Sequence, residues 1–145
     1  MGDPFRFARG PLFWDRQGRP IDVMDFARKH EDLDYHFVAQ HWVRGWQVST
    51  IWLGLNGNLN LLAKVPPLIF ETMIFPPPDV TISSDHLDDL DDYRDRHATE
   101  EAAQAGHDRA LAWVVEKLGP ESVADITGPL VPGTSDDTAD WDQLC

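Results

Sequence analysis

The chain almost lacks cysteine. Its only cysteine is Cys145, the last of 145 residues, and one cysteine cannot close an internal disulfide. A residue at the chain end is seldom ordered enough to serve as a nucleophile. Six tryptophans and seven phenylalanines supply bulky side chains for a core. We therefore expect apolar burial, rather than cross-links, to stabilise the fold.

Long apolar runs are also missing. No window approaches the roughly 18 apolar residues that a membrane-spanning helix requires. The opening sequence MGDPFRFARGPLFW contains no apolar segment of the kind found in signal peptides. The sequence therefore predicts a soluble protein that is neither secreted nor inserted into a membrane.

An excess of positive charge is absent too. The net charge is −13, and it is unevenly distributed. Residues 1–78 hold eight acids and eight bases, whereas residues 79–101 hold nine acids and two bases, a net charge of −7. Residues 118–145 hold six acids and no base. Because phosphate contacts require a basic face, we expect no direct binding to nucleic acid.

What the sequence does contain begins with a β-hairpin pattern. Two runs rich in β-branched and aromatic residues flank Arg44-Gly45, which is typical of two strands joined by a tight turn. A third run, LIFETMIF, alternates between two faces and stops at three successive prolines, which cannot donate to a sheet ladder. The strands are expected near 35–43, 46–55 and 67–75.

The hairpin turn sets an expected register. If Val43 faces Trp46, the pairs that follow on the same face are His41 with Val48, Ala39 with Thr50, and Phe37 with Trp52. In the third strand, one face carries Leu68, Phe70, Thr72 and Ile74, and the other carries Ile69, Glu71, Met73 and Phe75.

Two helices complete the expected fold. Asp22 and Thr99 are suitable N-caps for helices near 23–31 and 99–118, where apolar residues recur every three or four positions. We expect an α+β fold, in which a small antiparallel sheet of three to five strands is covered by these two helices. The predicted organisation is one domain at 1–118, with an acidic connection at 76–97, and an acidic Gly/Pro/Asp-rich tail at 119–145.

Motifs for catalysis and metal binding are absent from the sequence. It contains no H-E-x-x-H, no Cys-x-x-Cys, no P-loop and no G-x-S-x-G. His36 and His41 should lie on opposite faces of their strand because their separation is odd. Glu71 stands alone among apolar neighbours and could be a functional carboxylate or a paired one on a strand face. We expect no catalytic residue, no bound metal and no cofactor.

Three segments resemble a known group of proteins. The segments VSTIWLGL, PPLIFETMIF and YRDRHATEEAAQAGHDRALAWV follow one another along the chain. In the group, the patterns W-L-G-L, P-P-L-I-F-E-T-M and Y-A-T-E-E-A-x-x-G-H recur in the same order. This order resembles small uncharacterised proteins of actinobacterial phages and prophages. The group has no assigned activity, so the resemblance implies origin and fold. It singles out Glu71, Thr72 and His107 as surface candidates.

These observations favour a phage or prophage accessory protein of the host cytoplasm. It would bind a host or defence protein, with a basic surface, through acidic residues: Asp85, Asp88, Asp89, Asp91, Asp92 and Asp95. One alternative is a minor virion or assembly component whose tail orders on a neighbouring subunit. Another is a small metal-assisted hydrolase using Glu71 with His36, His41 or His107. The sequence leaves the oligomeric state open.

Overall fold

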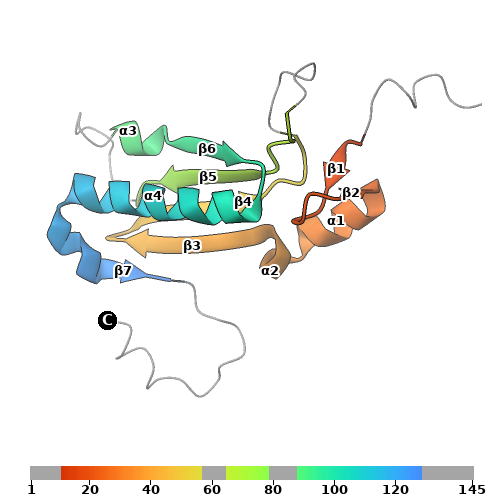
Figure 1. The fold of residues 1–145 in the computed structure, drawn as a ribbon. Coiled ribbons are helices and arrows are strands. Elements are labelled where there is room, and N and C mark those ends of the chain that lie inside the picture. Colours follow the sequence, from red (N-terminus) through yellow and green to blue (C-terminus); the bar gives the residue numbers. More distant parts are fainter. Residues whose placement is uncertain (1–10, 57–64, 79–87, 129–145) are drawn as a thin grey trace, which may run out of the picture.

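The computed structural model describes residues 11–56, 65–78 and 88–128, and contains a five-stranded antiparallel sheet (Figure 1). The strand order across the sheet is β6-β5-β4-β3-β7. The strands are β3 Phe37–Val43, β4 Trp46–Trp52, β5 Phe70–Phe75, β6 Arg94–His97 and β7 Ile126–Thr127. The predicted α+β class is confirmed.

The hairpin of β3 and β4 turns where the sequence predicts. Arg44 has φ 50° and Gly45 has φ 86°, the two positive values that a tight hairpin turn with matching strand twist requires. The predicted pairs of Val43, His41 and Ala39 are confirmed. The pair of Phe37 with Trp52 is wrong: the register shifts between Phe37 and Ala39, so that Phe37 lies opposite Ile51.

The helix α4, Glu100–Leu118, lies across one face of the sheet. Its N-cap is Thr99, whose hydroxyl oxygen accepts a hydrogen bond from the Ala102 backbone N–H at 3.1 Å. The helix ends at Gly119, which has φ 109° and is therefore suited to glycine. The predicted helix at 99–118 is confirmed.

A smaller unit formed by the N-terminal part of the described chain packs at one end of the sheet (Figure 1). It consists of β1 Phe13–Trp14, β2 Pro20–Ile21, α1 Val23–Glu31 and α2 Leu33–His36. The carboxylate of Asp22 caps α1 by accepting from the Asp25 backbone N–H at 2.8 Å, as predicted. The short helix α2 was not predicted, and it moves the start of β3 to Phe37.

Two apolar clusters lie between the helices and the same face of the sheet. The first cluster consists of Val43, Trp46, Val48, Ile74, Leu90, Ala110 and Val114, and the second of Trp52, Ile69, Phe70 and Ala103. Leu90 comes from α3, Asp88–Asp91, and the aromatic rings of α1 and α2 pack on the second cluster. In the part of the chain that the structure describes, every helix that contacts the sheet therefore does so on this face.

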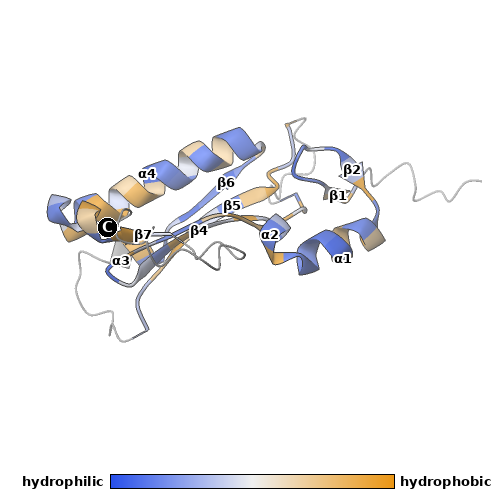
Figure 2. Cartoon of the chain, turned by 90° about the horizontal axis from the view of Figure 1, so that it is seen from below, coloured by the Kyte–Doolittle hydropathy of each residue, from blue (hydrophilic) through white to orange (hydrophobic). Residues whose placement is uncertain are grey.

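The opposite face of the sheet carries no described helix, and we call it the open face. The side chains that the strand register places there include Gln40, Trp42, Gln47, Ser49, Ile51, Glu71, Met73, Phe75, Arg94 and Arg96. Figure 2 shows the sheet nearly edge-on with α4 on one side of it. The fold is thus a two-layer arrangement over most of the sheet.

The described fold continues past the boundary expected at residue 118. Residues Pro120–Asp125 form a 3₁₀ helix, η1, and β7 then pairs with the edge of β3. The side chain of Ser122 is fully buried, and its hydroxyl donates to the Gly119 carbonyl at 2.6 Å. Arg44 Nε donates to Asp125 Oδ2 at 2.6 Å. The expected tail at 119–145 therefore contributes a fifth strand, and residues 129–145 lie outside the described residues.

We predict that two truncations will behave differently. A chain ending at Gly119 loses β7, the buried Ser122 and the partner of Arg44, and its melting temperature should fall by roughly 5 °C or more. A chain ending at Gly128 keeps all of these contacts and should melt within about 2 °C of the full chain. Thermal unfolding followed by circular dichroism measures both. Equal melting temperatures for the two truncations would show that β7 adds nothing to the fold.

Candidate functional site

A band of polar side chains crosses the helix-covered face of the sheet between the two apolar clusters. The strand register aligns Thr50 of β4 with Thr72 of β5 and with Asp95 of β6. Helix α4 brings His107 down onto this row, and β3 contributes His41. We call His41, His107, Thr50 and Thr72 the polar band.

Short contacts join the members of the polar band into one chain. His41 Nδ1 lies 2.8 Å from His107 Nε2, and His107 Nδ1 lies 2.8 Å from Thr50 Oγ1. Thr50 Oγ1 lies 2.7 Å from Thr72 Oγ1. His107 is only 1% exposed and the two threonines are fully buried, whereas His41 is half-buried. This series of contacts therefore leads from the partly accessible imidazole of His41 to the fully buried hydroxyl of Thr72.

Burial determines the protonation of His107. Burial, and to a smaller extent the proximity of His41, lower the pKa of His107 to about 4, and Asp108 opposes part of this shift. At neutral pH, His107 is thus an uncharged ring with one N–H and one lone pair. Either ring nitrogen can carry the proton, because Thr50 can donate or accept and His41 can do the same. The hydrogen bonds of the polar band are therefore complete with either tautomer of His107.

The three candidates singled out by the resemblance are not surface residues. Thr72 and His107 belong to the polar band, and Glu71 is 8% exposed on the open face. Thr50 and His41 were not candidates from the sequence. Their place in the sheet register could be predicted, but the helix residue that meets them could not, because sequence periodicity does not fix how a helix is positioned over a sheet.

Glu71 is paired with arginine. Its Oε1 lies 3.0 Å from Arg96 Nε and 3.4 Å from Arg94 Nε, and the three residues occupy neighbouring positions on β5 and β6. The negative charge of the Glu71 carboxylate is therefore balanced by the positive charges of these two guanidinium groups. Glu71 also faces away from His41 and His107, so the structure does not assemble the hydrolase set considered from the sequence.

His36 lies elsewhere, in the N-terminal unit. Its ring is 4.6 Å from the ring of His30, centroid to centroid. Burial lowers the pKa of His36, and His30 lowers it further. In the described ranges, no three His, Cys, Asp or Glu side chains come close enough together to hold a metal ion.

Gly106 precedes His107 in the A-G-H motif and has a steric role. A Cβ atom at position 106 would lie 2.3 Å from His97 Nε2, closer than real Cβ atoms approach other atoms. His97 belongs to β6 and is buried. Its Nε2 lies 3.3 Å from Asp95 Oδ2, but the two are not aligned as a hydrogen bond. Glycine at 106 therefore lets α4 approach the end of β6.

We predict that Gly106→Ala destabilises the protein although alanine is the better helix former. Helix propensity alone would stabilise the variant by about 1 kcal/mol, but overpacking against His97 should cost more and leave a net loss of roughly 1–3 kcal/mol. The control is Ala105→Gly at the adjacent exposed position, which should cost only about 1 kcal/mol. Urea unfolding measures both. A more stable Gly106→Ala variant would contradict the close approach of α4 to β6.

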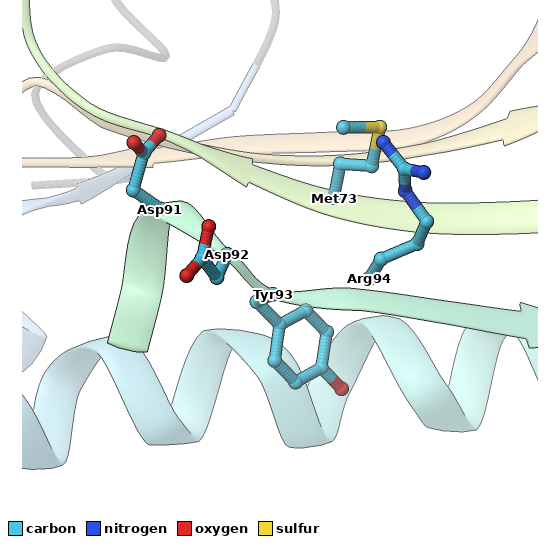
Figure 3. A pocket seen from close by; sticks show the side chains of 5 residues that line it. All are labelled: Met73, Asp91, Asp92, Tyr93 and Arg94. Carbon is cyan, nitrogen blue, oxygen red and sulfur yellow. The ribbon is translucent and has the colours of Figure 1, made fainter. Parts of the chain in front are cut away.

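Two of the acidic residues singled out by the sequence lie side by side in the chain at the end of α3 and line one hollow. Asp91 and Asp92 line a hollow of about 380 Å³ together with Met73, Tyr93 and Arg94 (Figure 3). We call Asp91, Asp92 and this hollow the acidic corner. Tyr93 points toward α4 in this view, and its ring centroid lies 5.3 Å from that of Trp113.

The other predicted acidic residues lie on β6, at the start of α3 or outside the described residues. Asp95 pairs with Thr72 on the opposite side of the sheet, with its Oδ2 3.3 Å from His97 Nε2 and 3.9 Å from Arg109 Nη2. Asp88 and Asp89 begin α3. Asp85 lies outside the described residues. The acidic corner therefore comprises two of the six predicted aspartates, and it adjoins the open face through Met73 and Arg94.

Comparisons with known proteins add no relationship. No protein-family model matches the chain, and neither the curated proteins nor the solved structures contain a significant match. Among the described residues, none of the helices has the length and apolar character needed to cross a bilayer.

Proposed function

We propose that this chain acts by binding another protein, with the open face of the sheet and the adjoining acidic corner as the contact surface. The observation that carries the proposal is the open face itself. It presents large side chains of the types enriched in protein interfaces, although the described helices all gather on the other side. Phe75 is the most exposed of these apolar side chains, at 40%.

The composition of the open face supports this proposal. Trp42, Ile51 and Met73 are half-buried, and two glutamines and a serine stand between them in the sheet. Such a mixture of apolar and uncharged polar groups is typical of a surface that alternates between water and a partner. The charged residues on this face lie mainly toward β6, where Glu71 already pairs with Arg94 and Arg96.

Charge indicates the class of partner. The chain carries a net charge of −13, and Asp91 and Asp92 stand at the margin of the open face beside Met73. A partner with apolar side chains flanked by Lys or Arg would bury the former on the sheet and pair the latter with the carboxylates. Long-range attraction between the two molecules would speed their encounter, and salt would weaken it over roughly 8–10 Å.

From the resemblance to small proteins of actinobacterial phages and prophages, we also propose a biological setting. In that setting the chain is an accessory protein of the host cytoplasm, and the partner is a basic host or defence protein. The function is binding rather than catalysis, and it requires neither a metal nor a cofactor.

The proposal predicts that two sets of substitutions will disrupt binding while the fold survives. Phe75→Ser removes an exposed aromatic anchor, and Asp91→Asn with Asp92→Asn removes two charges at the margin. A matched control, Glu101→Gln with Asp108→Asn, removes two charges from exposed positions of α4 away from the open face. Partners are first captured from lysate of a host strain by crosslinking and identified, and then purified for kinetic measurement.

We expect Phe75→Ser to raise the dissociation rate at least tenfold, because interface anchors act mainly on dissociation. The Asp91/Asp92 double variant should slow association several-fold at low salt and much less at high salt. The control should behave as the unmodified chain. If both test variants bind the purified partner with unchanged rates at all salt concentrations, the open face and acidic corner are not the contact surface.

A further inference from the structure

The contact between two imidazole rings in the polar band restricts how many protons the band can hold. The neutral pair carries one N–H on each ring, so one facing nitrogen donates and the other accepts across 2.8 Å. A first added proton can reside on His41, which then donates from Nδ1 to His107 Nε2, and every contact is kept. A second proton places N–H against N–H across the same gap, and the contact must break.

We propose that the His41–His107 pair is an acid-sensitive lock that holds α4 on the sheet when neutral or singly protonated and releases it when doubly protonated. His107 is the part of α4 that reaches the central strands with a polar side chain, and it lies between the two apolar clusters. If His107 leaves this position to hydrate its charge, α4 must move with it. Acid would then uncover the apolar residues that α4 now covers. This inference is independent of the proposed binding function.

The groups around the pair offer little compensation for a second positive charge. On α4, Asp108 favours the charged form of His107 but is exposed to solvent. On β6, Asp95 lies close to His97, and its Oδ2 is 3.9 Å from Arg109 Nη2, which already provides a positive partner. The described part of β4 presents Val48 and Thr50 toward the helix, and neither of them titrates.

The described parts of β5 and of the segment next to β7 likewise place no free carboxylate beside the His41–His107 pair. On β5, Thr72 faces the band, whereas Glu71 faces the other way and is bound by arginine. Next to β7, Gly128 lies near His41: a Cβ atom placed at this position would be 3.9 Å from His41 Nε2. No described carboxylate thus lies within the band to neutralise the doubly protonated pair.

The direction of the pH effect follows from the proton uptake of the unfolded chain. In the folded protein the pKa of His107 is lowered to about 4, whereas an unfolded histidine keeps a pKa of about 6.5. Between these values the unfolded chain binds the proton and the folded chain does not. The contribution of His107 to stability is therefore complete above about pH 6.5 and is lost as the pH falls toward 4. The unfolding equilibrium constant should rise by up to about tenfold per pH unit from this group alone.

Urea unfolding between pH 7 and pH 4.5 tests the lock in four chains: the unmodified protein, His107→Gln, His41→Gln and, as a control, His30→Gln. Protonation of carboxylates and of His36 occurs in both the unmodified chain and His107→Gln, so the difference between these two isolates His107. We expect the unfolding constant of the unmodified chain to rise with acid by up to tenfold per pH unit more than that of His107→Gln. His30→Gln removes a neighbour that lowers the pKa of His36 but leaves the His41–His107 pair intact, so this variant should keep most of the excess acid dependence over His107→Gln.

The His41→Gln variant separates the imidazole pair from simple burial. Without a second ring to repel it, His107 should accept its proton at higher pH with α4 in place, and the acid dependence should become shallower. An unmodified chain and His107→Gln with parallel acid dependence would overturn the lock. A His41→Gln variant as acid-sensitive as the unmodified chain would show that burial, and not the pair, is responsible.

If His107→Gln does not fold, NMR titration of the imidazole nitrogens in the unmodified chain decides the question. His107 should stay neutral until the α4 signals are lost near pH 4. Protonation of His107 near pH 6.5 with native α4 signals would overturn the proposal.

Discussion

The two hydrogen bonds of His107 connect the long helix to the sheet at a place that water does not reach. An uncharged imidazole satisfies both contacts, and the threonine pair behind it satisfies the next pair of polar groups. A buried polar chain of this kind stabilises only when it is complete, because each unpaired member would cost the free energy of its lost hydration. It therefore specifies one position of α4 along the sheet, which apolar packing alone would leave less strictly determined. The two apolar clusters on either side depend on that position.

The arrangement of the helices has a consequence for function. With α4, α3 and the aromatic residues of the N-terminal unit all on one face, the described part of the fold leaves the other face with half-buried tryptophan, isoleucine and methionine and with an exposed phenylalanine. Burial of these side chains by a partner would be favourable in the same way as core formation. Asp91 and Asp92 at the margin of the open face would favour partners that carry Lys or Arg beside their apolar side chains. Stability and recognition are thereby assigned to opposite faces of the same sheet.

Local signals in the sequence predicted much of the fold. The Arg44-Gly45 turn, the caps Asp22 and Thr99, and the stop at three prolines each act over a few residues, so their consequences could be read without knowledge of the rest of the chain. The fifth strand could not, because Ile126 and Thr127 form too short a run to be recognised and gain their partners only from the edge of β3. The shift near Phe37 has a similar origin, since α2 changes where the strand begins.

The candidate site was predicted only in fragments, for a related reason. Thr72 and His107 were singled out by a resemblance, yet their contact depends on the position of α4 over β4 and β5. Glu71 could have been functional or paired, and only the neighbouring β6 strand, with arginines at 94 and 96, decides between them. Contacts between distant segments carry the chemistry of this chain, and sequence periodicity does not report them.

The most direct test of the account is a double-mutant cycle between Thr50 and His107. Thr50→Val, His107→Gln and the double variant are compared with the unmodified chain by urea unfolding at pH 7. If the hydrogen bond of His107 to Thr50 fixes α4 to the sheet, the two substitutions should show a coupling free energy of roughly 1–3 kcal/mol. Free-energy changes that add within about 0.5 kcal/mol would mean that the two side chains do not act together, and the polar band could not then determine the position of the helix.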